Sequence, residues 1–155
     1  MDTKKIRNTL ENSELFTGLE ETDLKRISEL CRSETYKGGE YIFHQGDSGK
    51  DIFIIIDGYV FLERSVDFGK RKGKAIIGSF GKGKAFGCWS TILDDPHTLM
   101  SSAVCKSDTE VVRMSGPDLR NVMLSDTGLG FKIMEKICFL LRDRIQGVLG
   151  AMEKI

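Results

Sequence analysis

The feature that most constrains the fold is a series of short β-forming segments between Tyr41 and Met114, separated by turn-forming residues. The segments are rich in β-branched and aromatic residues: YIF, DIFIII, YVFLERSV, KAIIGSF, LMSSAVC and TEVVRM. Between two of them, Asp57-Gly58 predicts a tight hairpin. Short strands punctuated by turn signals are typical of an antiparallel barrel or jelly roll. We therefore expect a mainly β fold with flanking helices, in which 34–115 form an antiparallel barrel or jelly roll.

Helical periodicity precedes this β region. Ile6 and Leu10 lie four residues apart, as on one face of a helix. Four apolar residues further along also hold helical spacing: Leu24, Ile27, Leu30 and Cys31. Thr22 stands just before them and belongs to a residue type that caps helix starts. The sequence thus predicts N-terminal helices over 1–33, with Thr22 as an N-cap.

Helical signals return after Met114. Ser115 or Gly116, followed by Pro117, predicts the start of a helix, because proline is tolerated in the first turn. The segment 125–130 predicts a break, and one long helix is expected from there to the end of the chain. The region 116–155 should therefore hold two helices. The length of 155 residues fits a single domain over 1–155.

The last helix carries two apolar stripes. The first alternates steps of three and four residues, which is an a/d heptad pattern: Phe131, Met134, Cys138, Leu141, Ile145, Val148, Met152 and Ile155. The second stripe, Ile133, Ile137 and Leu140, is suited to packing the helix on its own domain. The first stripe exceeds what one small barrel needs. We expect a homodimer through this helix, with wholly intramolecular packing as the alternative.

Charge and cysteine content disfavour several classes of protein. Lys+Arg and Asp+Glu each number 23, so no overall field favours nucleic acid or a membrane surface, and the basic residues clustered over 70–84 are expected on a solvated hairpin. The sequence lacks an apolar run of bilayer length and an N-terminal signal core, so a cytoplasmic location is expected. The cysteines lack CxxC spacing and only His44 and His97 accompany them, so neither disulfides nor a metal site is expected.

The segment most suggestive of function runs from Phe80 to Ala103, FGKGKAFGCWSTILDDPHTLMSSA. Glycines at 81, 83 and 87 lead into a short helix-compatible piece. Backbone N–H groups at such a point suit a phosphate or another anion. Glycines in loops also serve simply to make turns, so this pattern alone leaves both interpretations open.

The segment Gly39–Gly58, GEYIFHQGDSGKDIFIIIDG, resembles the glycine-framed double strand of cyclic nucleotide-binding domains. That family includes bacterial regulators of the catabolite activator protein type and the regulatory subunits of cyclic-nucleotide-dependent kinases. Leu15–Leu19 and Ser115–Leu119 resemble the family's N-terminal motif and its step into the B-helix. The resemblance covers nearly the whole chain. It implies that 34–115 form a jelly-roll β-barrel of the double-stranded β-helix type, that the chain has a regulatory role and that the C-helix forms a dimer. The winged-helix DNA-binding domain of the bacterial regulators has no counterpart here, so we expect no direct DNA binding.

The resemblance also maps the family's phosphate-binding cassette onto 80–103. In the family, a Glu after Phe-Gly holds the ribose 2′-hydroxyl and a later Arg neutralises the cyclic phosphate. Phe86-Gly87 is retained, but Cys88 stands at the Glu position, and Leu99 or His97, depending on the register, stands at the Arg position. The implied ligand-contacting residues are Phe86, Gly87, Cys88, Trp89, Ser90, Leu99, Met100 and Ser101. A cyclic nucleotide is thus implied by resemblance only, and without both anchors ordinary cAMP or cGMP binding is not expected.

Two functional hypotheses follow. In the first, the chain is a regulatory module that senses a small molecule; in the second, it is a ligandless dimeric interaction or scaffold protein of the same fold. An enzyme is not expected, because a nucleophilic role of Cys88 beside His97 lacks a third group to orient the pair. Redox sensing through Cys88 is a separate alternative. Lys82 and Lys84 could supply charge to the site, although solvated side chains are the simpler interpretation.

Overall fold

The computed structural model describes residues 2–95 and 97–153. Within them, the α-helices are α1 (Asp2–Glu11), α2 (Glu21–Ser28), α3 (Gly116–Ser125) and α4 (Thr127–Met152), and a 3-10 helix, η1, spans Trp89–Leu93. The strands are β1 (Cys31–Tyr36), β2 (Tyr41–Phe43), β3 (Ser48–Gly49), β4 (Asp51–Asp57), β5 (Val60–Asp67), β6 (Lys72–Phe80), β7 (Ala85–Gly87), β8 (His97–Thr98), β9 (Ser102–Cys105) and β10 (Thr109–Ser115).

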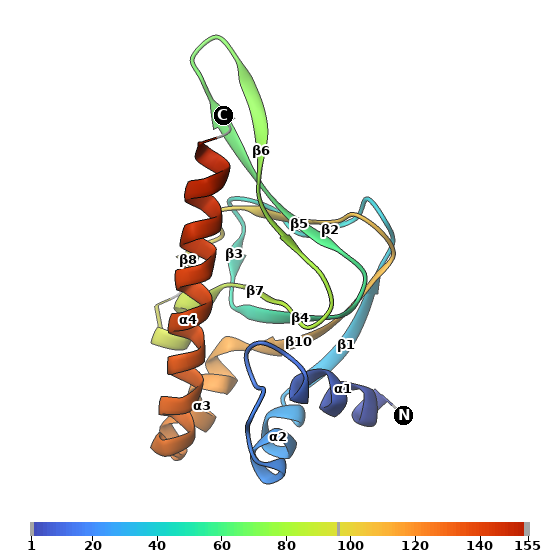
Figure 1. Cartoon of the computed structure of the whole chain (residues 1–155), viewed down its shortest axis with the longest axis vertical. Helices are drawn as coiled ribbons and strands as arrows, with labels where there is room; N and C mark the ends of the chain where they lie inside the picture. Colours follow the sequence, from blue (N-terminus) through green and yellow to red (C-terminus); the bar gives the residue numbers. More distant parts are fainter. Residues whose placement is uncertain (1, 96, 154–155) are drawn as a thin grey trace.

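The described strands form two four-stranded antiparallel sheets and a two-stranded ribbon. One sheet has the order β1-β10-β4-β7, the other has the order β2-β9-β5-β6, and β3 pairs with β8. The helices gather at one end and along one side, where α4 runs beside the sheets (Figure 1). The expected mainly β jelly-roll fold with flanking helices is confirmed, but as two facing sheets rather than one closed barrel among these residues.

The expected tight hairpin at Asp57-Gly58 is wrong. β4 pairs with β10 and β7, whereas β5 pairs with β6 and β9, so this turn carries the chain from one sheet to the other. Gly58 has φ +105°, and a Cβ there would lie 2.7 Å from the carbonyl oxygen of Asp108. The turn chemistry therefore predicts the tight bend and its glycine, but it does not determine which strands pair.

The predicted boundary between N-terminal helices and sheet is also wrong. α2 ends at Ser28, and Cys31 begins strand β1, which pairs with β10 from Cys31↔Met114 to Tyr36↔Thr109. This strand, CRSETY, lies at the edge of its sheet and is mostly polar, so hydrophobic periodicity does not reveal it. The N-cap of α2 is Glu20, without a side-chain hydrogen bond, rather than Thr22.

The C-terminal helices begin and end close to where the sequence predicts. The Ser115 hydroxyl accepts a hydrogen bond from the Asp118 amide as the N-cap of α3. The expected break over 125–130 is shorter in the structure, where only Asp126 separates α3 from α4. The Asp126 carboxylate caps α4 by accepting a hydrogen bond from the Leu129 amide. The second stripe of the last helix is buried as predicted: Ile133, Ile137 and Leu140.

Strand β4 belongs to two hydrophobic clusters at once. Ile52 and Ile54 face a cluster that the helices cover, whereas Phe53 and Ile55 face the cluster between the two sheets. Because both faces of β4 are covered, five consecutive residues are buried, and this accounts for the unbroken apolar run in its sequence.

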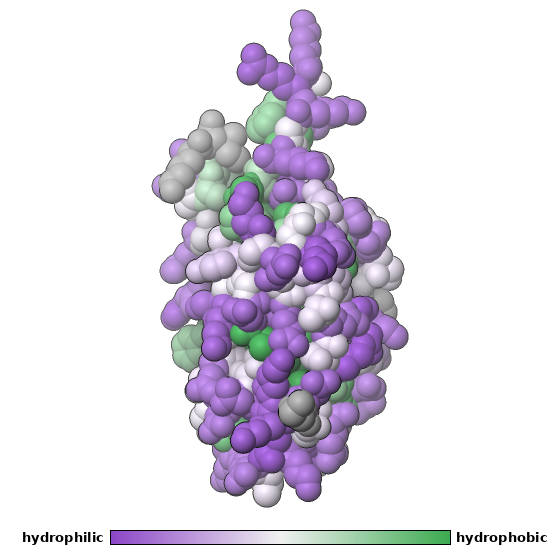
Figure 2. Space-filling model, turned by 90° about the vertical axis from the view of Figure 1, so that its right-hand side faces the viewer, coloured by the Kyte–Doolittle hydropathy of each residue, from purple (hydrophilic) through white to green (hydrophobic). Residues whose placement is uncertain are grey.

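The β5–β6 hairpin extends away from the body of the molecule (Figure 1). Its basic residues near the tip, Lys70, Arg71, Lys72 and Lys74, are exposed. In Figure 2, hydrophilic side chains project from the narrow end, with a small hydrophobic patch at their base. The basic cluster is therefore a solvated hairpin, as expected from the sequence.

Candidate functional site

The cassette-like segment is fixed to the first sheet by β7. Gly87 pairs with Ile52 of β4 and adopts φ +137°, a conformation that L side chains rarely adopt. The Cys88 amide then donates to the carbonyl of Asp51 at 3.0 Å. That N–H group is consequently not free to bind an anion, although the sequence suggests that backbone N–H groups of this segment suit one.

The predicted site residues meet in one cavity of about 580 Å³, which we call the cassette cavity. All of them line it: Phe86, Gly87, Cys88, Trp89, Ser90, Leu99, Met100 and Ser101. The remaining lining residues come from other parts of the chain: Phe43, Leu62, Arg64, Ile77, Phe80, His97, Thr98, Leu141, Arg144 and Val148. The cavity size lies within the range of small-molecule sites, roughly 300–1,000 Å³.

Leu99 and His97, the two alternatives for the family's arginine position, have different environments. Leu99 is 9% exposed, whereas His97 is exposed on β8, where it pairs with Gly49. Neither Lys82 nor Lys84 lines the cavity, and both side chains are exposed.

Helix α4 forms one wall of the cavity through three residues: Leu141, Arg144 and Val148. Arg144 connects α4 to the cassette segment, because it donates to the Ala85 carbonyl at 2.7 Å and pairs with the Glu14 carboxylate at 3.1 Å. Glu14 in turn accepts from the Ala85 amide at 3.0 Å, and the Arg144 guanidinium lies 4.1 Å from the centre of the Phe80 ring. A change at the cassette can therefore reach α4 through direct contacts.

The apolar stripe that was expected to form the dimer is only partly exposed, because some of its residues line the cavity or pack on the domain. Leu141 and Val148 are half-buried at the cavity, and Met134 is half-buried against the domain's own core. Cys138, Ile145 and Met152 are exposed, together with Phe131 at the start of the stripe. Ile155 lies outside the described residues. Part of the stripe thus packs within the chain, and the rest is left without a described partner.

Cys88 is 5% exposed, and its Sγ lies 3.5 Å from the Ser90 hydroxyl and 3.9 Å from the backbone carbonyl of His97. The recorded contact with His97 is thus to the main chain rather than to the imidazole. Over residues 2–95 and 97–153, no group of three His, Cys, Asp or Glu side chains is placed to hold a metal ion. No helix of the same residues is long and apolar enough to span a membrane.

Sequence reasoning missed Arg64. Leu62 and Arg64 are two residues apart on β5, so they share the face of the strand that lines the cavity. The Arg64 Nη1 donates to the carbonyl of Met100 at 2.5 Å, across from the strand to the cassette. No local motif marks this residue, because the contact joins positions 36 apart in the sequence.

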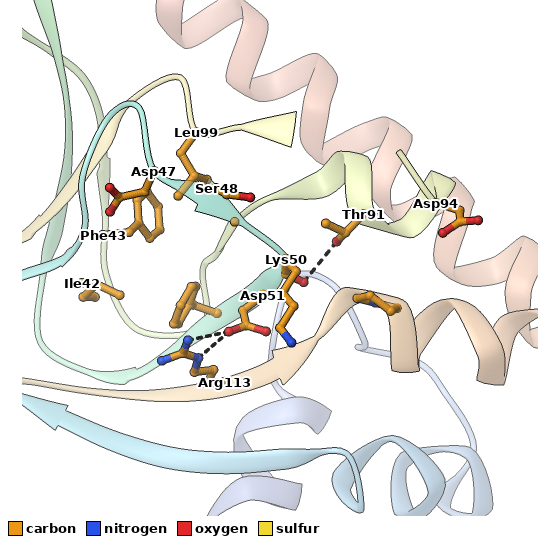
Figure 3. Close-up of a pocket in the computed structure, with 13 residues that line it drawn as sticks. Ile42, Phe43, Asp47, Ser48, Lys50, Asp51, Thr91, Asp94, Leu99 and Arg113 are labelled. Atoms are coloured by element: carbon orange, nitrogen blue, oxygen red, sulfur yellow. Dashed lines mark hydrogen bonds and ion pairs between the residues drawn. The ribbon is translucent and has the colours of Figure 1, made fainter. Parts of the chain in front are cut away.

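A second cavity, of about 480 Å³, also has Leu99 in its lining, and Figure 3 shows the residues around it. We call it the Arg113 cavity; Phe43 and Leu99 line both cavities. Its charged lining residues include three carboxylates and two cations: Asp47, Asp51, Asp94, Lys50 and Arg113. Leu99 is the only predicted site residue that borders it.

Arg113 is fully engaged with carboxylates. It pairs with Asp51 at 2.6 Å, as Figure 3 shows, and with Glu34 of β1 at 3.1 Å. Burial disfavours the charged form of Glu34, but hydrogen bonds from Tyr36, Arg32 and Arg113 outweigh it and lower the pKa of the carboxyl. Burial likewise opposes the charge on Arg113, but Asp51 and Glu34 outweigh it and raise the pKa of the guanidinium. Arg113 of β10 therefore links three strands, because Asp51 lies on β4 and Glu34 on β1.

The fold is thus a jelly roll whose last helix forms one wall of a cavity that the cassette-like segment also lines. The chain belongs to the cyclic nucleotide-binding domain family, whose model matches residues 33–126.

Individual relatives agree with this assignment. The chain is similar to the cyclic AMP receptor protein of Thermus thermophilus, with 29% identity over 109 residues, which is 70% of this chain and 48% of that protein. The chain spans less than half the length of the curated relatives it matches.

Two solved structures share the fold. A cyclic nucleotide-binding domain from Methylobacillus flagellatus superimposes with a TM-score of 0.78 at 20% identity, covering 99% of this chain and 82% of that one. The regulatory subunit of a cAMP-independent protein kinase A from Trypanosoma brucei gives a TM-score of 0.74 at 20% identity, covering 99% and 51%. That structure is a triple mutant, with one threonine changed to arginine, bound to cAMP.

Proposed function

We propose that this chain is a ligand-sensing regulatory module that acts in the cytoplasm, in which a small molecule in the cassette cavity acts on helix α4. One observation carries the proposal: the cassette residues and three residues of α4 line the same cavity. A ligand there would contact the cassette, β5 and α4 at once. It would therefore favour the position of α4 that completes the binding site.

The ligand of this module is not expected to be an ordinary cyclic nucleotide. Cys88 and Leu99 supply neither the carboxylate for a ribose hydroxyl nor the guanidinium for a cyclic phosphate. Each missing charge-assisted contact removes about 1.5–3 kcal/mol of binding free energy.

The coupling between cavity and helix can be tested with 1-octanol as an uncharged probe of the apolar walls. We expect saturating 1-octanol to slow hydrogen exchange in the peptide covering Leu141–Val148 by about threefold or more, because an occupied cavity holds that part of α4 against the sheets. Exchange in α1, which does not line the cavity, is the internal control. Unchanged exchange in α4 while the probe is bound would contradict the proposal.

A ligandless dimeric scaffold is the second candidate, and the exposed apolar side chains on α4 favour it. Ile145 is 60% exposed and Met152 is 61% exposed, as is typical of surfaces that a partner covers. Homodimerisation through α4 is compatible with ligand sensing as well. A sedimentation measurement showing a dimer, combined with no α4 response to any cavity probe, would favour the scaffold over the sensor.

A further inference from the structure

We propose that the cassette cavity takes an organic monoanion with an apolar body, and that Arg64 is the residue that holds the anionic group. The inference rests on the proposed function, because it names the class of ligand for the same cavity. Three features of the described residues carry it: the charge of the lining, the engagement of its two arginines and the nature of the walls.

The lining of the cassette cavity is cationic. Arg64 and Arg144 are its arginines, and none of the described residues that line it is Asp or Glu. The neighbouring Arg113 cavity is the opposite case, with three aspartates against Arg113 and Lys50. An anion is thus favoured in the cassette cavity and disfavoured in the Arg113 cavity.

The two arginines are not equally available. Arg144 is neutralised by Glu14, hydrogen-bonded to the Ala85 carbonyl and placed over the Phe80 ring. Arg64 makes no ion pair with any described residue, and its recorded hydrogen bond is one donation from Nη1 to the Met100 carbonyl. Its neighbour Glu63 accepts from the Tyr41 hydroxyl and pairs with Lys74. Because a guanidinium has five N–H donors, Arg64 retains donors for a carboxylate or a similar group.

The side chains that form the walls of the cassette cavity indicate the chemical nature of the rest of the ligand. Most are apolar or aromatic: Phe43, Leu62, Ile77, Phe80, Phe86, Trp89, Leu99, Met100, Leu141 and Val148. A nucleotide would set the polar atoms of its base and ribose against these side chains, and unpaired polar groups are costly to bury. A molecule with one anionic end and an apolar body matches both the arginine and the walls.

The position of Arg64 fits this role geometrically. β5 pairs with β9 as far as Glu63↔Ser102, and Arg64 follows where β9 has not yet begun. Its side chain reaches from one sheet to the loop that carries Met100 and Ser101. The anionic end would therefore lie beside the loop that corresponds to the family's phosphate-binding segment, although the cation comes from another strand.

Calorimetric titration of the whole chain with octanoate and with 1-octanol tests the inference, because the two probes share a chain and differ in charge at pH 7.5. We expect Arg64→Met to weaken octanoate about 10-fold and 1-octanol less than about twofold. Arg64→Lys, which keeps the charge but loses the planar fork, should give an intermediate octanoate affinity. Arg142→Met removes an exposed arginine that pairs with Asp143 outside the cavity, and it should change neither affinity.

The variant Val148→Phe tests whether the probes bind in the cassette cavity, because a larger side chain in the α4 wall should weaken the binding of both probes. If Arg64→Met leaves octanoate affinity unchanged while Val148→Phe weakens both probes, the anion inference is overturned and the ligand-sensing proposal stands. If neither probe binds the wild-type chain, or if Val148→Phe affects neither, both proposals are overturned. The fluorescence of Trp89, the single tryptophan and a lining residue, gives an independent readout of occupancy.

Discussion

The double variant Cys88→Glu/Met100→Arg is expected to bind cAMP at least about 100-fold more tightly than the wild-type chain, because two charge-assisted contacts worth about 1.5–3 kcal/mol each are supplied together. Cys88 follows the retained Phe86-Gly87, so a glutamate there restores the order of the family's cassette. Met100 follows Leu99, one of the two positions that the resemblance implies for the family's arginine. It is 63% exposed and lines the cavity, so an arginine there enters the site without loss of core packing.

The matched variants separate the two anchors and the possible registers. Cys88→Glu alone should gain little, because the phosphate would still lack a cation. Cys88→Glu/Leu99→Arg should gain less than the Met100 variant, because it removes a buried side chain that packs against Gly49. Cys88→Glu/His97→Arg tests the other register. Calorimetric titration with cAMP measures all four, and a folded set in which none binds would show that the cassette backbone no longer has the family's geometry.

The variant Gly87→Ala is expected to lose about 3 kcal/mol or more of its free energy of unfolding, because a forced left-handed conformation and a backbone clash act together. Gly87 has φ +137°, and a Cβ there would lie 2.4 Å from the carbonyl oxygen of Asp51. That carbonyl also accepts the Cys88 amide, so it cannot move away without breaking the contact that holds the cassette.

The same chemical change at Gly147 is the control. Gly147 lies within α4, and a Cβ there meets nothing within 4 Å. Alanine is the better helix former, so Gly147→Ala should stabilise the chain by about 0.5–1 kcal/mol. Urea denaturation of both variants compares them directly. A loss below about 1 kcal/mol for Gly87→Ala would mean that the segment can relax, and that its conformation is not imposed by the fold.

The sequence predicts those features of the molecule that depend on residues close together in the chain. The cassette residues come from two short stretches, 86–90 and 99–101, and their common cavity follows once the jelly roll is recognised. The buried stripe of α4 can also be predicted from the sequence, because its apolar residues repeat at the helical period. The N-cap at Ser115 and the glycine at the bend after β4 follow from local chemistry too.

The features that the sequence does not predict depend on contacts between distant parts of the chain. Strand β1 is polar and lies at a sheet edge, so only its partner β10 defines it. The turn at Asp57-Gly58 has the residues of a hairpin, but the two hydrophobic clusters on opposite faces of β4 keep β4 and β5 in different sheets. Arg64 and Arg144 reach the cavity from β5 and α4, and nothing in the sequence around them marks that placement.

The central claim is that the chain keeps the architecture of a cyclic nucleotide-binding domain while its cassette lacks the anchors for the nucleotide. Calorimetric titration of the wild-type chain with cAMP and with cGMP tests this claim most directly. With both anchors missing, the dissociation constants should lie above about 1 mM, which corresponds to less than about 4 kcal/mol of binding free energy. Saturable binding of either nucleotide with a micromolar dissociation constant would contradict the claim.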